Sequence, residues 1–509
     1  MSCSKIFSGT LPELTENIIK YFQDDYSTLY SCVLVNRFWC RLSIPLLWKN
    51  PFSISTGNYN FIRIYLHNLN VELKTKLNEY KINENLLLSN TLFNYPSFLK
   101  YLNLSKIVTS VEKWFYTTRI KNLDIKKLII ISLLKIFIKN EVNLHTLEIE
   151  INLYIEYFDD ILELILQNLN FILNAKILKL FILKSKLFNN NSNSTLINNR
   201  VLQVINLHQN LKNIILTYNN DKEFLFYQSL LLSKDYNCSN TLNTITLYRI
   251  NFKDMINLNK MFEQLNVLES VHIIFCYSLN TSFIQQILNL TKPFKLRSLF
   301  LNGRSGIKKS SLLLLLQKSG CYLKNFRYST MYNESDRVRQ MFGSVINYCK
   351  NIKYLDIDDI IYPVVLDLIE NIKQNLNYLF ISSEIIRFRG SPIILRNLGQ
   401  ILPSRLEYLD LTLCIDVSDF EVFLKNSQGI FIKKLLIKDL DENNYDNILP
   451  YIKKYIMKEK RVGYLNFRNH NKELFDFSDE VKEFKLYNIR VRKYEDLYFN
   501  IYQFMQKLY

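Results

Sequence analysis

The sequence predicts an α/β protein in which a small all-helical module is followed by a long repeat solenoid. Three observations indicate this fold class. Three short helical patterns lie in the first 52 residues, a unit of the form L-x-x-L-x-L recurs from about residue 99, and helical patterns separate its copies. We expect four parts: the helical module over residues 1–52, a helical connector or N-terminal cap over 53–98, the solenoid over 99–486 and a C-terminal cap over 487–509.

Apolar residues at helical spacing define the three helices of the module: Leu14, Ile18, Tyr21 and Phe22 in the first, Leu29, Cys32 and Val33 in the second, and Trp39 and Leu42 in the third. Ser27 and Asn36 are the expected N-caps of the second and third helices, and Pro45 is expected to end the third. A unit this small buries only about 60% of its unfolded surface. Apolar residues beyond its own core would therefore contact a partner.

Leu11-Pro12, the pair Ile18/Ile19, the run Leu34–Trp39 and the exit Pro45–Trp48 carry a family resemblance. The segment from Leu11 to Trp48 resembles an F-box, the module by which substrate receptors dock onto the Skp adaptor of SCF-type ubiquitin ligases. The resemblance implies an adaptor-binding role for Leu11, Pro12, Ile18, Leu34, Val35, Trp39 and Trp48. The alternative is an ordinary helical cap on a larger domain, with Trp39 and Trp48 as core aromatics.

The repeating unit predicts one short strand per copy, because its aliphatic positions alternate. Copies begin at Leu99, Leu144, Leu211, Leu242, Leu268, Leu296, Leu323, Ile352, Leu376, Leu406, Ile432 and Val462, and a weaker copy begins at Ala175. From Leu211 onward the steps are roughly 24 to 31 residues. A strand followed by a return helix stacks into a curved solenoid with a parallel sheet on its concave side.

This period is close to that of leucine-rich repeats, roughly 20 to 29 residues. The array is similar to the leucine-rich-repeat substrate domains that follow an F-box in many receptors. Such units often carry Asn or Cys at the ninth position, where the side chain satisfies backbone groups as the strand turns away. The positions that fit are Asn152, Asn219, Cys276 and Cys414.

The third and fifth residues of each copy are expected to project from the concave sheet. Three successive copies then place Tyr354, Tyr378 and Tyr408 side by side, about 5 Å apart per strand. The fifth positions add Asp356, Phe380 and Asp410 beside them. This aromatic and acidic column suits a protein segment with basic and apolar groups. The alternative is that tyrosine merely fills strand positions well.

Charge, cysteine and hydropathy patterns narrow the class of protein. The formal net charge is +17, but lysines alternate with acidic residues, so we expect solubility and weak nonspecific binding rather than a nucleic-acid site. The eight cysteines form no CxxC pair, which favours reduced thiols over a zinc site. The most apolar run, Leu128–Leu134, is far shorter than the roughly 20 residues that span a bilayer. We expect a cytoplasmic and/or nuclear protein without membrane contact.

Catalytic and metal-binding patterns are weak. The segment 302–311 lacks the spacing of a phosphate loop, and the acidic run Asp356, Asp358 and Asp359 lacks that of a calcium loop. The histidines have no nucleophile or metal partner at motif spacing: His67, His145, His208, His272 and His470. We therefore expect no enzyme activity and no cofactor or metal.

The sequence thus leads to one functional hypothesis and two alternatives. The resemblance implies a non-catalytic subunit that binds the Skp adaptor, and through it a cullin-RING ubiquitin ligase, and that holds an unknown protein substrate on the solenoid. One alternative is a leucine-rich-repeat interaction scaffold that does not act in a ligase. The other is a basic nucleic-acid-associated protein, whose binding would fall steeply with salt. A polar tract at residues 189–195 is expected to be an exposed loop.

Overall fold

A computed structural model gives the fold and side-chain positions for most of the chain. It describes all residues except 1–11, 24, 54–58, 68, 70–73, 77–78, 80–90, 119–122, 153–157, 174, 176, 184–198, 201–202, 205–206, 208–210, 218–236, 330–334, 359–362, 384–390, 442–443, 500–503 and 505–509. Leu11, the tract 189–195, His208 and Asp359 lie outside the described residues. The chain divides into two compact units, Met1–Asn219 with Ser233–Leu242, and Asn220–Leu232 with Asn243–Tyr509.

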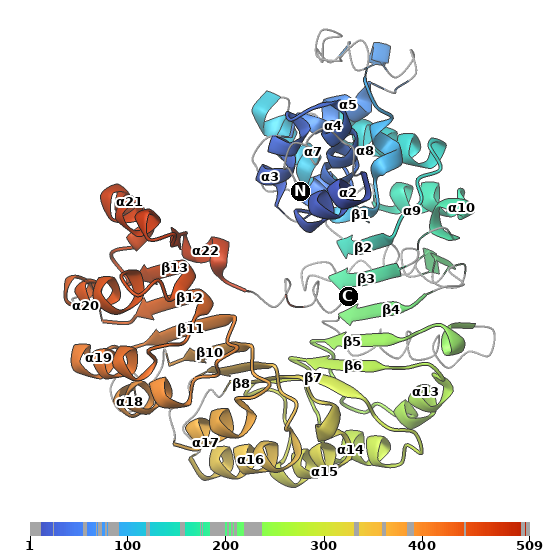
Figure 1. Ribbon diagram of the computed structural model, residues 1–509. Helices are drawn as coiled ribbons and strands as arrows, with labels where there is room; N and C mark the ends of the chain where they lie inside the picture. The colour runs from blue at the N-terminus through green and yellow to red at the C-terminus, as the bar shows by residue number, and fades with distance from the viewer. Residues whose placement is uncertain are drawn as a thin grey trace. The chain divides into compact units, whose positions relative to one another are not determined.

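The first unit begins with three short helices, α2 (Pro12–Tyr21), α3 (Tyr26–Val33) and α4 (Arg37–Leu47) (Figure 1). Asn36 caps α4 as predicted, because its Oδ1 accepts a hydrogen bond from the Trp39 N–H at 2.9 Å. Two expectations were wrong. Asp25, rather than Ser27, caps α3, since its carboxylate accepts from the Thr28 N–H at 3.1 Å and has no hydroxyl proton to compete. Pro45 lies inside α4, which ends within the next turn.

The expected helical connector contains short helical pieces that pack into the first unit. They are η1 (Pro51–Ser53), α5 (Phe61–Leu66) and η3 (Tyr95–Phe98). The Tyr65 ring on α5 is fully buried and meets Phe137 edge-on at 5.1 Å between centroids. The connector is thus part of this unit's core, as far as its described residues extend.

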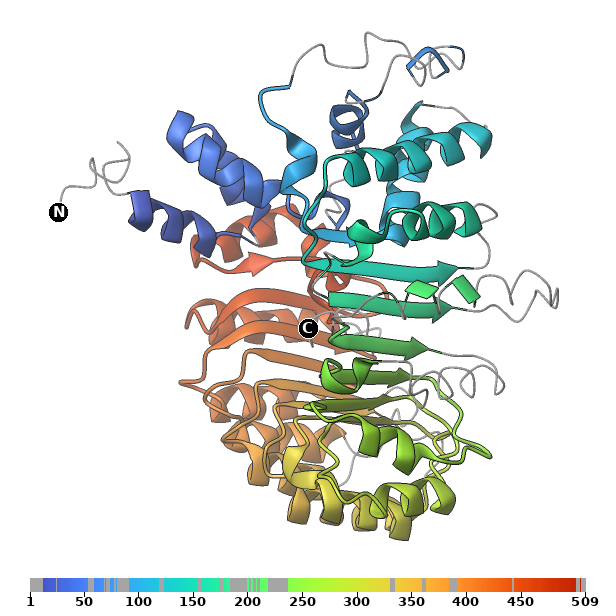
Figure 2. The ribbon, with the colours of Figure 1, turned by 90° about the vertical axis from the view of Figure 1, so that its right-hand side faces the viewer.

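The first unit continues with strands and return helices in alternation. Their bounds are β1 (Tyr101–Asn103), α7 (Leu104–Thr118), α8 (Leu123–Lys139), β2 (Thr146–Asn152), α9 (Phe158–Leu166), α10 (Leu169–Leu173), β3 (Ile177–Leu183) and β4 (Asn213–Thr217). Strands β1, β2 and β3 form a parallel sheet, and the arrows of β2 and β3 point the same way in Figure 2. No helix in the described ranges is long and apolar enough to cross a membrane.

The second unit carries a long parallel sheet whose strands follow the chain order from β5 to β14. The strands are β5 (Thr244–Tyr248), β6 (Ser270–Ile274), β7 (Leu296–Leu301), β8 (Asn325–Ser329), β9 (Tyr354–Asp358), β10 (Tyr378–Ser382), β11 (Tyr408–Leu413), β12 (Ile432–Asp439), β13 (Val462–Arg468) and β14 (Arg490–Val491). Within this unit the sheet curves, and its helices follow one face (Figure 1). We call the opposite face of β8–β13 the inner face.

The return helices of the second unit alternate with these strands. They are α13 (Leu258–Gln264), α14 (Thr281–Leu288), α15 (Lys309–Ser319), α16 (Ser335–Tyr348), α17 (Pro363–Ile372), α18 (Ser391–Ile401), α19 (Val417–Asn426) and α20 (Tyr445–Ile452), which is followed by a π-helical turn, Lys453–Met457. Their apolar side chains and the inward strand positions form the core, where Leu355, Ile357, Leu368 and Leu379 are fully buried. The parallel sheet with flanking helices agrees with the predicted α/β solenoid at this level.

Every predicted copy of the repeat, including the weak one at Ala175, coincides with a strand from β1 to β13. Cys276, at the ninth position of its repeat, satisfies a backbone group as expected: its buried thiol donates to the Leu247 carbonyl at 3.2 Å. Asn219 lies outside the described residues. The thiols of Cys32 and Cys349 are also free and buried.

The C-terminal residues take a form that the sequence did not indicate. After α21 (Ser478–Leu486), strand β14 extends the sheet beside β13. A short helix, α22 (Tyr494–Leu497), follows, and the next described residues run over the inner face. We call Tyr494–Phe499 together with Phe504 the covering segment.

Candidate binding sites

The three N-terminal helices share a small core that uses only part of their apolar residues. Ile19, Leu29, Cys32 and Trp39 are its buried members. Partly buried side chains pack around them: Phe22, Phe38, Leu42, Leu46 and Leu47. On α2 the buried residues are Thr15 and Ile19, so the apolar stripe predicted for this helix faces mainly away from the core.

Large apolar side chains are left exposed on α2, on α3 and in the turn after α3. They are Leu14, Tyr21, Tyr30, Leu34 and Val35, with Tyr21 86% and Leu34 71% exposed. We call these five residues the apolar surface. Isolated exposed leucines are common on proteins, but several within one small helical module are typical of an interaction site.

Of the seven residues expected to bind an adaptor, the six that the structure describes occupy different environments. Leu34 and Val35 belong to the apolar surface, Pro12 is exposed at the start of α2, and Ile18 is half-buried. Trp39 is a core residue. Trp48 is half-buried and packs against Tyr65 and Tyr95, with ring centroids 5.2 Å and 4.3 Å away. The two tryptophans therefore shape the module from inside, whereas Tyr21 and Tyr30 are exposed aromatics that the resemblance did not single out.

The second candidate site lies on the inner face of the second unit. The strand register places Tyr378 between Tyr354 and Tyr408, and Phe380 between Asp356 and Asp410. The predicted neighbour relations of all six residues are thus confirmed. Four of them form an aromatic cluster, Tyr354, Tyr378, Phe380 and Tyr408, in which the Phe380 ring lies 4.9 Å from Tyr354 and 4.7 Å from Tyr408.

The covering segment lies on this aromatic cluster. The Phe499 ring is 6.4 Å, 5.8 Å and 6.4 Å from the rings of Tyr354, Tyr378 and Tyr408. The Phe504 ring lies 5.0 Å from Tyr354. As a result Tyr354, Phe380 and Tyr408 are buried, and only Tyr378 keeps partial exposure. The expectation of an open aromatic column was wrong for this conformation, because residues far along the chain fold back onto it.

Two buried carboxylates lie beside the aromatic cluster. Asp410 accepts hydrogen bonds from the hydroxyls of Tyr494 at 3.1 Å and Tyr408 at 3.5 Å. Burial raises the pKa of Asp410 to about 7, against the lowering effect of the Tyr494 hydrogen bond. Asp356 pairs with Arg327 and accepts from the Tyr354 hydroxyl at 3.1 Å. Burial raises its pKa as well, although the Arg327 charge opposes the rise.

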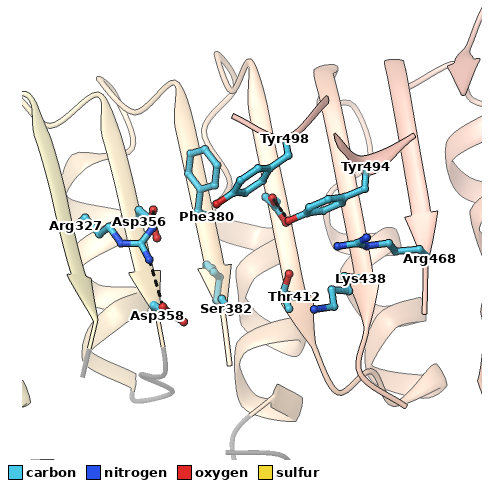
Figure 3. Close-up of a pocket in the computed structure, with 12 residues that line it drawn as sticks. Arg327, Asp356, Asp358, Phe380, Ser382, Thr412, Lys438, Arg468, Tyr494 and Tyr498 are labelled. Atoms are coloured by element: carbon cyan, nitrogen blue, oxygen red, sulfur yellow. Dashed lines mark hydrogen bonds and ion pairs between the residues drawn. The ribbon is translucent and has the colours of Figure 1, made fainter. Parts of the chain in front are cut away.

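A polar pocket of about 320 Å³ opens next to the covering segment (Figure 3). One register row across β9–β13 lines it: Asp358, Ser382, Thr412, Lys438 and Arg468. Tyr494 and Tyr498 reach over the strands from the covering segment, and Arg468 lies under the Tyr494 ring at 3.6 Å from its centroid. The Arg327 guanidinium joins Asp356 to Asp358, which it meets at 3.3 Å. The pocket therefore has an acidic end, a hydroxyl centre and a basic end.

The residues considered as candidates for catalysis or metal binding make contacts within the fold. Asp356 and Asp358 bind Arg327, and His272 is buried with its Nδ1 2.7 Å from the Ser298 Oγ. Burial lowers the pKa of His272 to about 3, so the ring is neutral. Residues 302–311 form a turn that leads into α15. Over the residues placed by the structure, no group of three or more His, Cys, Asp or Glu side chains could hold a metal ion.

Comparison with known proteins adds no assignment to either site. No family model matches this chain, and no curated protein matches it.

Proposed function

We infer that the protein is the substrate-recognition subunit of an SCF-type cullin-RING ubiquitin ligase. In this proposal α2–α4 act as an F-box that binds the Skp adaptor, and the solenoid holds the protein to be ubiquitinated. The chain itself catalyses no step. It raises the effective concentration of a substrate lysine near the ubiquitin-conjugating enzyme by holding both partners at once.

The observation that carries the proposal is the apolar surface. A free helical module gains nothing from exposing Leu34, Tyr21 and Tyr30 to water, because each would contribute roughly 1.5–3 kcal/mol if buried. Leu34 and Val35 are also two of the positions to which the resemblance gives an adaptor-binding role. The apolar surface and the F-box motif therefore support the same partner.

The repeat unit supports the second half of the proposal. A long parallel sheet with helices on one face leaves the other face for binding, as is general in solenoid proteins. The inner face concentrates aromatic and charged side chains, which are common anchors in protein interfaces. A binding solenoid joined to an adaptor module is the arrangement expected of a receptor.

Retention of the purified chain on immobilised Skp adaptor tests the proposal. Leu34→Lys should weaken retention by at least about tenfold, because a charge replaces an apolar anchor. The substitution is compatible with folding, since Leu34 is the exposed C-cap of α3 and a cation is favourable at a helix C-terminus. Leu486→Lys is the matched control, because Leu486 is 81% exposed at the end of α21.

The outcomes separate the candidate functions. Equal retention of wild type, Leu34→Lys and Leu486→Lys contradicts the proposed contact, and absence of retention for the wild type contradicts the F-box assignment itself. Adaptor retention without recruitment of a cullin would instead favour the interaction scaffold.

A further inference from the structure

The inner face of the second unit is covered through a small number of side chains. The Phe499 N–H donates to the Tyr408 hydroxyl at 3.3 Å, and the Tyr494 hydroxyl donates to Asp410 at 3.1 Å. The Tyr494 N–H also donates to Glu473 at 2.7 Å, and the Arg468 guanidinium lies against the Tyr494 ring. Several aromatic ring pairs complete the contacts, including Phe504 with Phe300 at 4.9 Å. Tyr494 and Asp410 are 84 positions apart in the sequence, and Phe499 and Tyr408 are 91 positions apart. The covering segment is therefore held as a ligand would be, by anchors placed along a surface.

The covering segment also differs from the structural elements of the solenoid. Strand β14 ends at Val491, and α22 is only four residues long. Tyr498 and Phe499, which directly follow α22, have no strand or helix assignment. Backbone ladders, which fix the other elements in place, are thus replaced here by side-chain contacts.

The surface beneath is larger than the segment that lies on it. The pocket of about 320 Å³ continues the covered area along the register row of Ser382, Thr412 and Lys438. Tyr378 remains partly exposed at the other side of Phe499. A competing ligand can therefore make first contacts while the covering segment is still in place.

We propose that the inner face is a groove for a protein segment bearing aromatic side chains, one of them a tyrosine, and that the covering segment occupies it as an internal competitor. A ligand of this kind would place rings on Tyr354, Tyr378 and Tyr408 and donate a hydroxyl to Asp410. The inference rests on the proposed receptor function for its biological meaning, since it names the class of substrate segment. The groove itself is independent of adaptor binding.

The occupancy of the groove follows mass action. An external ligand binds only those molecules in which the groove is free. Its apparent affinity is therefore the intrinsic affinity multiplied by that fraction, which an intramolecular competitor reduces. Weakening the covering segment must therefore strengthen binding of a segment added in trans. A purely structural role for the covering segment gives no such gain.

The probe is a fluorescent peptide with the sequence of residues 494–504, added to the full-length chain. Phe499→Ala in the protein removes the ring that contacts three tyrosines, so the peptide should bind this variant at least about tenfold more tightly than wild type. Tyr494→Phe is a milder second variant, because it removes only the hydroxyl that donates to Asp410. Fluorescence anisotropy gives the dissociation constants.

Two controls keep the experiment specific. Phe431→Ala removes a phenylalanine ring that is 56% exposed elsewhere, and this variant should bind the peptide as the wild type does. A peptide with alanine at the position of Phe499 should bind all chains weakly. Equal binding of the original peptide to wild type and both segment variants, or binding to none of them, overturns the proposal. Peptide binding by a chain that the adaptor does not retain would keep the groove and overturn the receptor function.

Discussion

At the scale of single residues, the buried carboxylates are the most unusual feature of the second unit. Asp356 and Asp410 occupy equivalent positions on β9 and β11, with Phe380 between them. Arg327 compensates the charge of Asp356, whereas Asp410 relies on tyrosine hydroxyls. The nearby Arg468 charge also favours the charged form of Asp410, but burial outweighs it, because a charged carboxylate is costly to bury. Asp410 is therefore the more pH-sensitive of the two.

Asp410→Asn should make the second unit less sensitive to pH. In the folded state the pKa of Asp410 is raised from its usual 3.8 to about 7, so the folded chain binds a proton that the unfolded chain releases. The contribution of Asp410 to stability is therefore greatest below about pH 4, falls as the pH rises to about 7, and stays lower above it. The loss is at most about 4 kcal/mol, and the amide should recover part of it at pH 8.

Urea unfolding at pH 4 and pH 8 measures this effect. The difference in unfolding free energy between variant and wild type should be larger at pH 8 than at pH 4. Asp367→Asn, at an exposed carboxylate on α17, is the control and should leave the pH profile unchanged. A variant with the same pH profile as the wild type would contradict the raised pKa of Asp410.

The sequence located Asp356 and Asp410 but not their environment. Alternation within the repeat predicts which face of a strand a residue occupies, because that is a local property of the backbone. Burial of the same residue depends on whether another part of the chain covers that face. Here the cover comes from Tyr494 and Phe499, and no local pattern connects them to the strands beneath.

At the scale of elements, the strands were the most predictable part of the fold. Each copy of the repeat carries its own alternating pattern and needs only its neighbours to complete a core, so short-range information is sufficient. Strand β14 was missed because its two residues, Arg490 and Val491, are too few to carry a pattern. The end of α4 was misplaced because proline limits a helix only within about a turn, not at its own position.

Two glycines in return helices should respond oppositely to alanine. In α18, a Cβ on Gly399 would lie 2.6 Å from the Phe423 carbonyl oxygen of α19, so Gly399→Ala should destabilise the second unit by roughly 1–3 kcal/mol. In α16, a Cβ on Gly343 meets nothing within 4 Å, so Gly343→Ala should stabilise by roughly 0.5–1 kcal/mol. Shifts of the urea midpoint in opposite directions test the packing of α18 on α19. A stabilising Gly399→Ala would show that the two helices are further apart.

At the scale of the whole molecule, several lysines of the repeat array pair with carboxylates. Lys295 pairs with Glu269, Lys453 with Glu480 and Glu483, and Lys472 with Asp446. Each pair is partly exposed and contributes little to stability. Together such pairs interleave positive and negative charge along the repeat. The weak nonspecific binding expected from the net charge of +17 stays a prediction.

Binding to duplex DNA should accordingly be weak and depend shallowly on salt. A basic groove that neutralised many phosphates would give a slope of log affinity against log salt near −0.9 per phosphate contact. We expect a slope smaller in magnitude than about 3, measured by anisotropy between 50 and 200 mM salt, the range over which such slopes are resolved. A much steeper slope would favour the nucleic-acid alternative over the receptor.

The distribution of tryptophans makes the two units separable by spectroscopy. All three lie in the first unit, with Trp39 and Trp114 buried and Trp48 packed against tyrosine rings. The second unit contains tyrosines but no tryptophan. Fluorescence excited at the red edge of the absorption band comes from tryptophan, so it follows the unfolding of the first unit alone. A denaturation curve read by tryptophan emission and by far-ultraviolet dichroism would show whether the first unit unfolds together with the rest of the chain.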